Sequence, residues 1–282
     1  ASMETMIQDA EKTYGKNTTK AIEKIKKIKE QQLLGVELNA KMFTLASTNM
    51  ILRGDGSSNI QKGSSFDRPP GLYEKFKADK LLLNPPFTFV ENGMPFLEHG
   101  LKFMEKGGRA AIIIQDSAGS GKAAKTNKRI LKNNTLIASI KMPVDTFQPS
   151  AGVQTSIYIV EAGKPHNFEM DTVKFIDFRN DGYKRTLRGN YEIDHPSERY
   201  QDIVKIFRLG RAAVRNPDFH QELWDLDKVY VEDLITDSGI DWNFEFHQVN
   251  DTSPTEEEFM KTVGEYLAFE VNQLLTGRGE ND

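Results

Sequence analysis

Short apolar runs that alternate with amphipathic segments constrain the fold of this chain more than any other feature of its sequence. Strands are predicted at residues 33–38, 78–83, 109–114, 136–141, 154–160 and 173–178. Helices are predicted at residues 3–30, 40–52, 95–105, 124–132 and 197–209. Strands that alternate with helices imply a mostly parallel sheet covered on both faces. We therefore expect an α/β fold, in which the strands at 136–141 and 154–160 form an antiparallel hairpin at one edge of the sheet.

The regular pattern weakens after residue 180, and this change suggests a division of the chain. We expect residues 1–180 to form the core domain and residues 181–282 to form an extension of mixed and helical structure. Residues 256–275 carry apolar side chains at helical spacing, which predicts an amphipathic helix near the end of the extension. Such a helix needs a surface to cover, either on another protein or on its own domain.

Composition excludes several classes of protein. The chain has 37 basic and 41 acidic residues, so its net charge of -4 does not indicate a nucleic-acid binder, and any DNA contact must come from local patches. No stretch approaches the roughly 20 apolar residues that cross a bilayer, and the N-terminus lacks a signal peptide. We expect a cytoplasmic protein without a membrane partner. Cysteine is absent and the five histidines lack metal-ligand spacing, so we expect no metal site.

The most informative motif is Asn84-Pro85-Pro86-Phe87, which directly follows the predicted strand at 78–83. Open parallel sheets bind their ligands at the carboxyl ends of strands. The prolines fix the backbone, while the Pro85 carbonyl and the Asn84 side chain offer two hydrogen-bond acceptors. Together these oxygens can hold an exocyclic amine while Phe87 stacks on the attached ring. The alternative is a tight turn with Phe87 in the core.

A second strand end carries an acid. Glu37 closes the apolar run that begins at residue 33, and a predicted helix follows it. A carboxylate in that position can accept hydrogen bonds from ribose hydroxyls and therefore suits a nucleoside cofactor. The alternative is an ordinary solvated carboxylate.

These features resemble, in their order along the chain, those of amino-methyltransferases that use S-adenosylmethionine, and in particular the modification (M) subunits of type I restriction-modification systems. The resemblance covers about the first 180 residues. It implies a Rossmann-like methyltransferase sheet and transfer of a methyl group from S-adenosylmethionine to the exocyclic amine (N6) of adenine in DNA. The alternatives are a methyltransferase that acts on RNA or on a protein glutamine, and a non-catalytic interaction module.

The resemblance also assigns roles to individual residues. Residues 84–87 match the catalytic loop that grips a flipped-out adenine. Glu37, with Leu38 beside it, matches the acid that binds the cofactor ribose. Ser64 and Ser65 fall where the family usually places a Gly-Asp pair near the cofactor's adenine. Ser64 stands in place of the acid of that pair, which is a departure from the family pattern.

Two clusters of basic residues supply local patches for DNA. They are Lys122, Lys125, Lys128 and Arg129 in the first cluster, and Lys184, Arg185 and Arg188 in the second. Each cluster can meet DNA phosphates, although a merely solvated basic surface is an equal alternative. Neither patch can read a DNA sequence by itself.

The resemblance implies a set of partners. Double-stranded DNA is the substrate, a separate specificity subunit reads its sequence, and two modification subunits clasp the duplex. Whether a restriction subunit joins them stays open. The helix at residues 256–275 is the candidate for docking on the specificity subunit, with packing onto its own domain as the alternative.

The resemblance places further elements before the first helix of this sequence. These are the family's N-terminal helical region and its glycine-rich cofactor loop, which follows the central strand of the sheet. The sequence given would then begin just inside the helix after that loop. We expect these 282 residues alone to bind the cofactor weakly or not at all and to be inactive, whereas the complete protein is a site-specific adenine methyltransferase.

Overall fold

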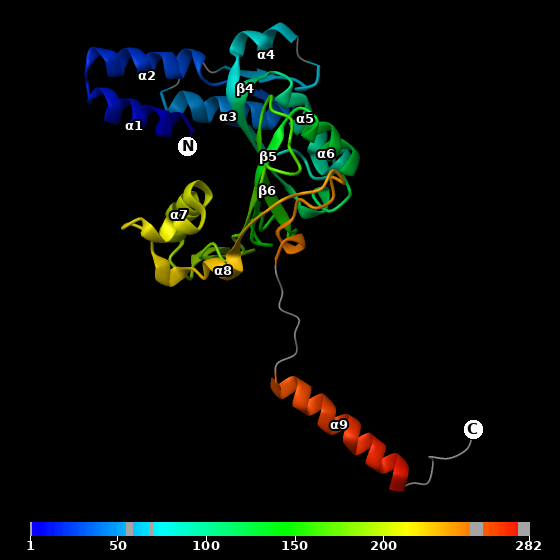
Figure 1. Ribbon diagram of the computed structural model, residues 1–282. Helices are drawn as coiled ribbons and strands as arrows, with labels where there is room; N and C mark the ends of the chain where they lie inside the picture. The colour runs from blue at the N-terminus through cyan, green and yellow to red at the C-terminus, as the bar shows by residue number, and fades with distance from the viewer. Residues whose placement is uncertain (1, 55–58, 68–69, 249–255, 276–282) are drawn as a thin grey trace. The chain divides into compact units, whose positions relative to one another are not determined.

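A computed structural model of the protein describes residues 2–54, 59–67, 70–248 and 256–275. The chain divides into two compact units (Figure 1), and the boundary between them falls after His247. The first unit contains three sheets and the helices that surround them. The second contains α9 (Glu256–Leu275), which has the bounds predicted for the amphipathic helix.

Among the residues described, the largest sheet has six strands in the order β10-β7-β5-β6-β4-β3. Figure 1 labels β4, β5 and β6 of this sheet. In chain order these strands are β3 (Ala78–Leu83), β4 (Met104–Gln115), β5 (Thr135–Lys141), β6 (Thr155–Glu161), β7 (Val173–Asp177) and β10 (Tyr230–Asp233). Strand β3 is parallel to β4, and β5 is parallel to β7, whereas β6 and β10 are antiparallel to their neighbours. Strands β3, β4, β5 and β7 therefore share one direction, which confirms the predicted α/β fold with a mostly parallel sheet.

The hairpin of β5 and β6 is antiparallel, as predicted, but it does not lie at an edge of the sheet. Strand β6 also pairs with β4, and β5 also pairs with β7. The expected edge position was wrong because β7 and β10 continue the sheet beyond β5. Strand β10 lies after residue 180 and has only four residues, which is too short for an alternation of apolar and polar side chains to predict it from the sequence.

Two apolar clusters form the core, one on each face of the largest sheet. The first contains Ile112 and Ile114 of β4, while Ile113, which points the other way, packs against the second. The helices in these clusters are α5 (Met94–Leu101) and α6 (Ala124–Leu131) in the first, and α7 (Pro196–Leu209) and α8 (Leu226–Val229) in the second. Full burial of one such side chain contributes about 1.5–3 kcal/mol. The sheet is therefore covered on both faces, as predicted.

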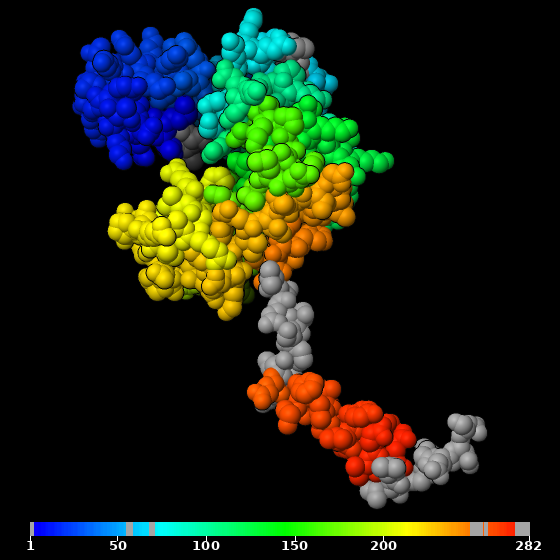
Figure 2. Space-filling view, viewed as in Figure 1, coloured from blue at the N-terminus to red at the C-terminus, as the bar shows by residue number. Residues whose placement is uncertain are grey.

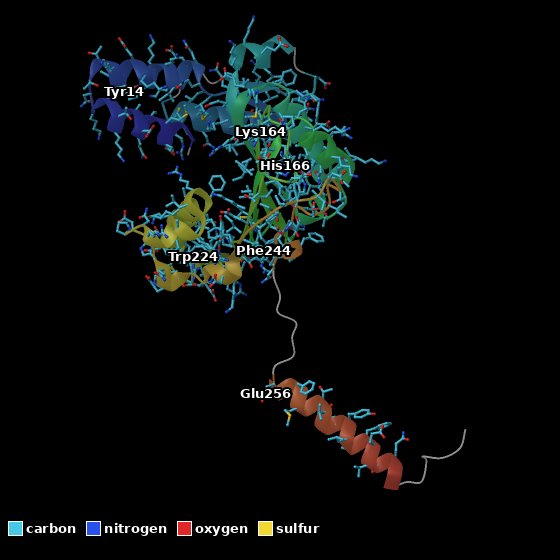
Figure 3. The ribbon with its side chains drawn as sticks, in the orientation of Figure 1. Tyr14, Lys164, His166, Trp224, Phe244 and Glu256 are labelled. Carbon is cyan, nitrogen blue, oxygen red and sulfur yellow. The ribbon has the colours of Figure 1, made fainter. Side chains whose placement is uncertain are left out.

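Segments on both sides of residue 180 contribute to this core. Phe244 is buried in the first cluster and Trp224 packs against the second (Figure 3). The surface of the first unit likewise joins residues before 180, in green, to later residues, in yellow and orange (Figure 2). Further short elements complete this unit, namely α4 (Pro70–Phe76), β8 (Tyr183–Thr186), β9 (Gly189–Glu192), η1 (Val90–Gly93), η2 (Asp116–Ala118), η3 (Gly210–Arg215), η4 (Gln221–Leu223) and η5 (Phe244–Phe246).

The N-terminal segment forms two helices instead of the single helix predicted for residues 3–30. They are α1 (Ser2–Tyr14) and α2 (Thr19–Gln31). Gly15 adopts a left-handed backbone conformation with a φ of 86°, which ends α1. The Thr18 side chain accepts a backbone hydrogen bond from the first turn of α2 at 3.2 Å. Periodicity alone missed this break because the turn contains no proline.

A separate sheet follows these helices. Strands β1 (Gly35–Glu37) and β2 (Ile60–Lys62) pair in parallel, and α3 (Ala40–Leu52) connects them. Although α3 is rich in apolar residues, none of them is buried, and Leu45 is 53% exposed. In the part of the chain that the structure describes, β3 pairs only with β4, so one edge of the largest sheet is open.

Membrane insertion was not expected from the sequence. Within the residues described, none of the helices combines the length and the apolar character that a membrane span requires.

Candidate active site

The Asn-Pro-Pro-Phe tetrapeptide lies at the carboxyl end of β3, which ends at Leu83. The backbone beyond it turns sharply through Glu91, Asn92 and Gly93, whose φ angles are 52°, 56° and 102°. Three successive residues with positive φ are uncommon, since a Cβ atom makes this conformation unfavourable. The surroundings must therefore hold the turn in place.

Two contacts hold it. A Cβ atom on Gly93 would lie 2.6 Å from Cγ of Pro85, so the turn packs directly on the first proline of the tetrapeptide. Asn92 is fully buried, and its Nδ2 donates a hydrogen bond of 2.7 Å to Oγ of Ser117. Because Ser117 belongs to η2, just beyond β4, the turn is fixed to the carboxyl end of the neighbouring strand.

Phe87 contacts a second aromatic ring. Its ring centroid lies 5.0 Å from that of Phe147, with the ring planes at 85°, which is a favourable edge-to-face geometry. Both rings are half-buried, Pro85 is buried and Asn84 is exposed. Phe87 is in neither core cluster. Beyond the end of β3, the exposed Asn84 is thus followed within three residues by a half-buried ring that contacts a second half-buried ring.

Phe147 comes from the loop between β5 and β6, defined here as the β5–β6 loop (residues 142–154). The side chain of Gln154 closes the base of this loop by donating to the carbonyl of Met142. At its start, the Thr146 hydroxyl donates to the carbonyl of Pro143 at 2.6 Å. Sequence analysis missed Phe147, because its proximity to Phe87 depends on the pairing of β6 with β4.

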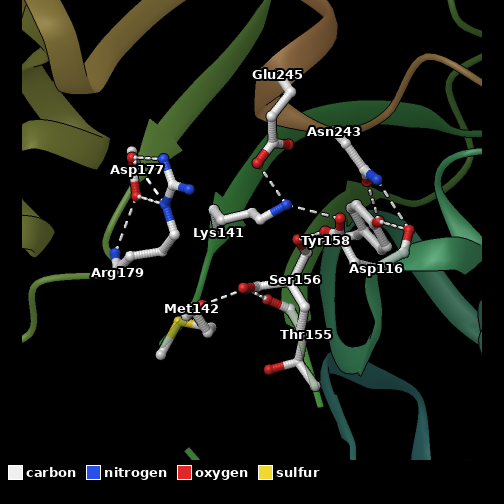
Figure 4. A network of polar contacts seen from close by, with 11 residues as sticks. Asp116, Lys141, Met142, Thr155, Ser156, Tyr158, Asp177, Arg179, Asn243 and Glu245 are labelled. Atoms are coloured by element: carbon white, nitrogen blue, oxygen red, sulfur yellow. Dashed lines mark hydrogen bonds and ion pairs between the residues drawn. The ribbon is translucent and has the colours of Figure 1, made fainter. Parts of the chain in front are cut away.

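A buried ionic network lies at the same end of the sheet (Figure 4). The ammonium group of Lys141, whose side chain is 7% exposed, lies 2.7 Å from Oδ2 of Asp116 and 2.5 Å from Oε1 of Glu245. The Ser156 hydroxyl donates to Oδ1 of Asp116 at 2.5 Å. A buried charge is costly unless it is paired, so these contacts fix the ends of β4, β5 and β6 relative to one another.

Tyr158 and Asn243 extend this network. The Tyr158 hydroxyl donates to Oδ1 of Asn243 at 2.5 Å, and Nδ2 of Asn243 donates to the Asp116 carbonyl at 2.9 Å. Burial raises the pKa of Tyr158 well above its ordinary value, so the phenol stays a donor at neutral pH. Residues after 180 therefore help to build this end of the sheet, which the sequence did not predict.

The candidate cofactor residues lie together at the carboxyl end of the β1–β2 sheet. Oε1 of Glu37 accepts the backbone N–H of Asn39 at 2.7 Å, while Oε2 has no donor among the residues described. Leu38 is 69% exposed. The backbone N–H of Gly63 donates to the Glu37 carbonyl at 2.9 Å, which places Ser64 next to the end of β1.

The loop after β2 is anchored through its backbone. The Ser65 carbonyl accepts hydrogen bonds from the Tyr73 hydroxyl at 2.9 Å and from Nε2 of His99 at 3.2 Å. Burial lowers the pKa of His99, so its ring is neutral at neutral pH. Phe66 stacks with Phe89 at 5.9 Å. Since Phe89 lies two residues after the tetrapeptide, this stacking links the loop after β2 to the segment after the tetrapeptide, a contact that the sequence analysis missed.

The first basic cluster lies on and before α6. Lys122, Lys125 and Lys128 are exposed and form no ion pair within the described part of the chain. Arg129 instead donates two hydrogen bonds of 2.8 Å to the carboxylate of Glu98. This hydrogen-bonded contact lowers the pKa of Glu98. Three of the four basic residues in this first cluster are therefore exposed and unpaired among the residues described, as a contact with phosphates requires.

The second basic cluster lies on the hairpin of β8 and β9. Lys184 and Arg188 are exposed, but the side chain of Arg185 is only 11% exposed. Arg185 is paired with the carboxylates of Asp145 and Asp181. Arg185 is thus buried and ion-paired, whereas Lys184 and Arg188 lie on the surface.

An acceptor-bearing tetrapeptide thus lies at one strand end of this α/β fold, and a carboxylate lies at another. The family comparison is more specific: the chain matches the family model described as N-6 DNA Methylase over residues 13–92 and 89–257. The chain therefore belongs to the N-6 DNA methylase family, which confirms the resemblance inferred from the sequence.

Two curated relatives show how much of a whole protein this chain represents. The type II restriction enzyme and methyltransferase RM.BcgI of Heyndrickxia coagulans is 30% identical over 262 residues, which are 89% of this chain and 39% of the relative. The type I restriction enzyme EcoEI methylase subunit of Escherichia coli is 26% identical over 155 residues, 48% of this chain and 31% of the relative. The chain thus spans less than half the length of these relatives.

Solved structures show the same fold. The type I restriction enzyme EcoKI M protein superposes with a TM-score of 0.58 at 16% identity, covering 92% of this chain and 63% of that one. A chain from a type I restriction-modification complex gives a TM-score of 0.63 at 17% identity, covering 98% and 60%.

Proposed function

We propose that the complete protein transfers a methyl group from S-adenosylmethionine to N6 of adenine in double-stranded DNA, as the modification subunit of a type I restriction-modification system. Family membership supports the reaction class. The observation that carries the proposal is the tetrapeptide at the carboxyl end of β3, where Asn84 is exposed and Phe87 faces Phe147.

The tetrapeptide acts on the adenine amine through two oxygens. The Asn84 side-chain oxygen and the Pro85 carbonyl accept the two N–H groups of the amine, which draws its lone pair out of conjugation with the ring. The Gly93 turn behind Pro85 keeps that carbonyl in place. Phe87 and Phe147 offer ring surfaces to the flipped base, and one base–aromatic stack contributes about 1–3 kcal/mol. Positioning by these groups is the main source of catalysis.

The residues at the end of the β1–β2 sheet fit the nucleoside part of the cofactor. Glu37 keeps one carboxylate oxygen without a donor among the residues described, so it can accept hydrogen bonds from ribose hydroxyls. Leu38 and the backbone around Ser64 and Ser65 lie beside it and would line the adenosine. When bound, S-adenosylmethionine supplies the methyl group from a positively charged sulfur.

DNA contact is assigned to the exposed cations of both basic clusters. Lys122, Lys125 and Lys128 on the α6 side, with Lys184 and Arg188 on the β8–β9 hairpin, would neutralise phosphates without reading sequence. Sequence recognition is assigned to a separate specificity subunit.

A second candidate function keeps the methyl transfer and adds cleavage of DNA by the same protein. RM.BcgI, which is described as both restriction enzyme and methyltransferase, matches more of this chain than the EcoEI subunit does. If the complete protein belongs to that class, it also cuts DNA. Cleavage of unmethylated DNA by the purified complete protein would favour this candidate over a separate modification subunit.

The test of the proposal is a genome-wide map of methylated adenines in the source organism, compared between the intact gene and an Asn84→Ala version. Loss of the amine acceptor should remove one class of methylated adenine, set in a split recognition sequence, and leave every other class unchanged. If one strain expresses the intact protein, the other expresses the Asn84→Ala protein, and their maps are identical, the proposal is contradicted. RNA, a protein glutamine or a non-catalytic role would then be favoured.

A further inference from the structure

The β5–β6 loop is held at its tip by a side chain from another element. Within the loop, the backbone N–H of Gln148 donates to the Asp145 carbonyl at 2.9 Å, which closes a turn around Phe147. The Asp145 carboxylate accepts the backbone N–H of Arg185 at 2.7 Å and the guanidinium Nη1 of the same residue at 3.3 Å. Arg185 therefore contacts the turn that contains Phe147 through two hydrogen bonds to Asp145, one from its backbone and one from its side chain.

The guanidinium of Arg185 is also held by residues outside the β5–β6 loop. Its Nη2 donates at 2.5 Å to Oδ2 of Asp181, whose side chain is fully buried, and the Tyr200 hydroxyl donates at 2.8 Å to the same oxygen. The guanidinium lies over the Tyr183 ring at 5.1 Å. Burial and the Asp181 carboxylate raise the pKa of Tyr200 to about 12, so the phenol stays a donor. A planar guanidinium with partners on several sides is well oriented for bidentate contact.

The element that carries Arg185 stands apart from the largest sheet. Strands β8 and β9 form a sheet of their own, so side-chain contacts such as Arg185 to Asp145 set their position relative to the β5–β6 loop. The same hairpin exposes Lys184 and Arg188. One element thus combines surface cations with a buried cation that holds a wall of the proposed base site.

We propose that Arg185 is a positioning residue for methyl transfer: through Asp145 it holds Phe147 against Phe87, so that a flipped adenine meets a preformed aromatic site. The inference rests on the proposed function, because it assumes that the target base enters beside these rings. It also gives Arg185 a role other than the phosphate contact expected from the sequence.

The experiment uses the complete protein with the subunits it needs for methylation. The DNA carries 2-aminopurine at the target adenine of the sequence found by the methylation map, since 2-aminopurine fluorescence rises when the base leaves the helical stack. Arg185→Met should lower this fluorescence change. On the same duplex with adenine at the target position, which supplies the 6-amino group that 2-aminopurine lacks, Arg185→Met should reduce kcat by roughly tenfold, while KM for the cofactor stays unchanged. Arg185→Lys should lose less kcat and less of the fluorescence change than Arg185→Met. It should not reach the values of the unaltered protein, because an ammonium cannot bridge two carboxylates in the same geometry.

A double-mutant cycle with Asp145→Ala tests the contact itself. If Arg185 acts through Asp145, the double variant should lose no more activity than the more severe single variant. Arg211→Met is the matched control: it removes another arginine–aspartate pair, with Asp227, and no hydrogen bond or ion pair joins Arg211 or Asp227 to the β5–β6 loop among the residues described. This control should leave flipping and kcat unchanged.

Each outcome separates the inference from the proposed function. Normal flipping and kcat in Arg185→Met would overturn the inference, as would an equal loss in Arg211→Met. Fully additive losses in the cycle would show that Arg185 does not act through Asp145. If the unaltered protein does not methylate DNA, the proposed function fails, and the assignment of Arg185 fails with it.

Discussion

At the scale of single residues, Gly93 supports the tetrapeptide by packing against Pro85. Its φ of 102° lies in the region that favours glycine, and a Cβ atom there would overlap Pro85. Asn92, before it, also takes a positive φ and is held through Ser117. Unfavourable backbone conformations of this kind persist only where the surroundings hold them. The ring of Pro85, and with it the proposed acceptor carbonyl, is therefore held against this turn.

Gly93→Ala should destabilise the protein and impair methylation. The backbone conformation alone costs about 1 kcal/mol with alanine, and the overlap with Pro85 should raise the loss in the free energy of unfolding to about 2–3 kcal/mol. Urea unfolding measures this loss. The matched control is Gly107→Ala, because Gly107 has a φ of 81° and a methyl group added there would meet no described atom beyond its chain neighbours within 4 Å. Equal losses in the two variants would contradict a specific role for the Pro85 contact.

At the scale of elements, the sequence predicts what local periodicity determines. The strand before Asn84, the helix after Glu37 and the bounds of α9 follow from runs of apolar residues and from capping. The contact of Phe87 with Phe147 depends on strand order, and the Arg185 to Asp145 contact on the position of a short hairpin. No local pattern specifies either contact. The assignments of residues 84–87 and Glu37 to substrate and cofactor stay predictions.

The terminal helix α9 carries a testable prediction at this scale. Phe259 and Leu267 lie on the same face at helical spacing and are 56% and 57% exposed. We expect Phe259→Asp with Leu267→Asp to abolish co-purification with the specificity subunit, because burial of this apolar face would drive docking. Lys261→Glu, on the opposite face, is the control and should change nothing. Normal co-purification of the double aspartate variant would exclude this surface as the docking site.

At the scale of the whole molecule, the two proposed binding regions lie on different sheets. Glu37 ends β1, which pairs only with β2 among the strands described, whereas Asn84 follows β3, the open edge of the largest sheet. Among the described residues, no backbone ladder therefore joins the cofactor residues to the tetrapeptide. The Phe66 to Phe89 stacking and the His99 to Ser65 hydrogen bond carry that connection. Side-chain contacts of this kind fix a geometry less firmly than paired strands do.

A polypeptide of residues 1–282 should consequently bind S-adenosylmethionine weakly. The open edge of β3 and the uncovered apolar surface of α3 leave the adenosine and methyl ends of the site poorly fixed relative to each other. Isothermal titration calorimetry should detect no binding at micromolar concentration, while the complete protein serves as the positive control. A micromolar Kd for residues 1–282 would show that this geometry is sufficient.

The buried Lys141 network has a consequence for how such proteins can recombine. Asp116 and Lys141 come from the first half of the chain, but Glu245 and Asn243 come from its later part. A crossover between related genes near residue 180 would keep Lys141 with Asp116 but join it to a residue 245 from a different parent gene. A crossover beyond residue 247 would transfer the whole network intact, so hybrid proteins should tolerate exchange of α9 far better than exchange of all residues after 180.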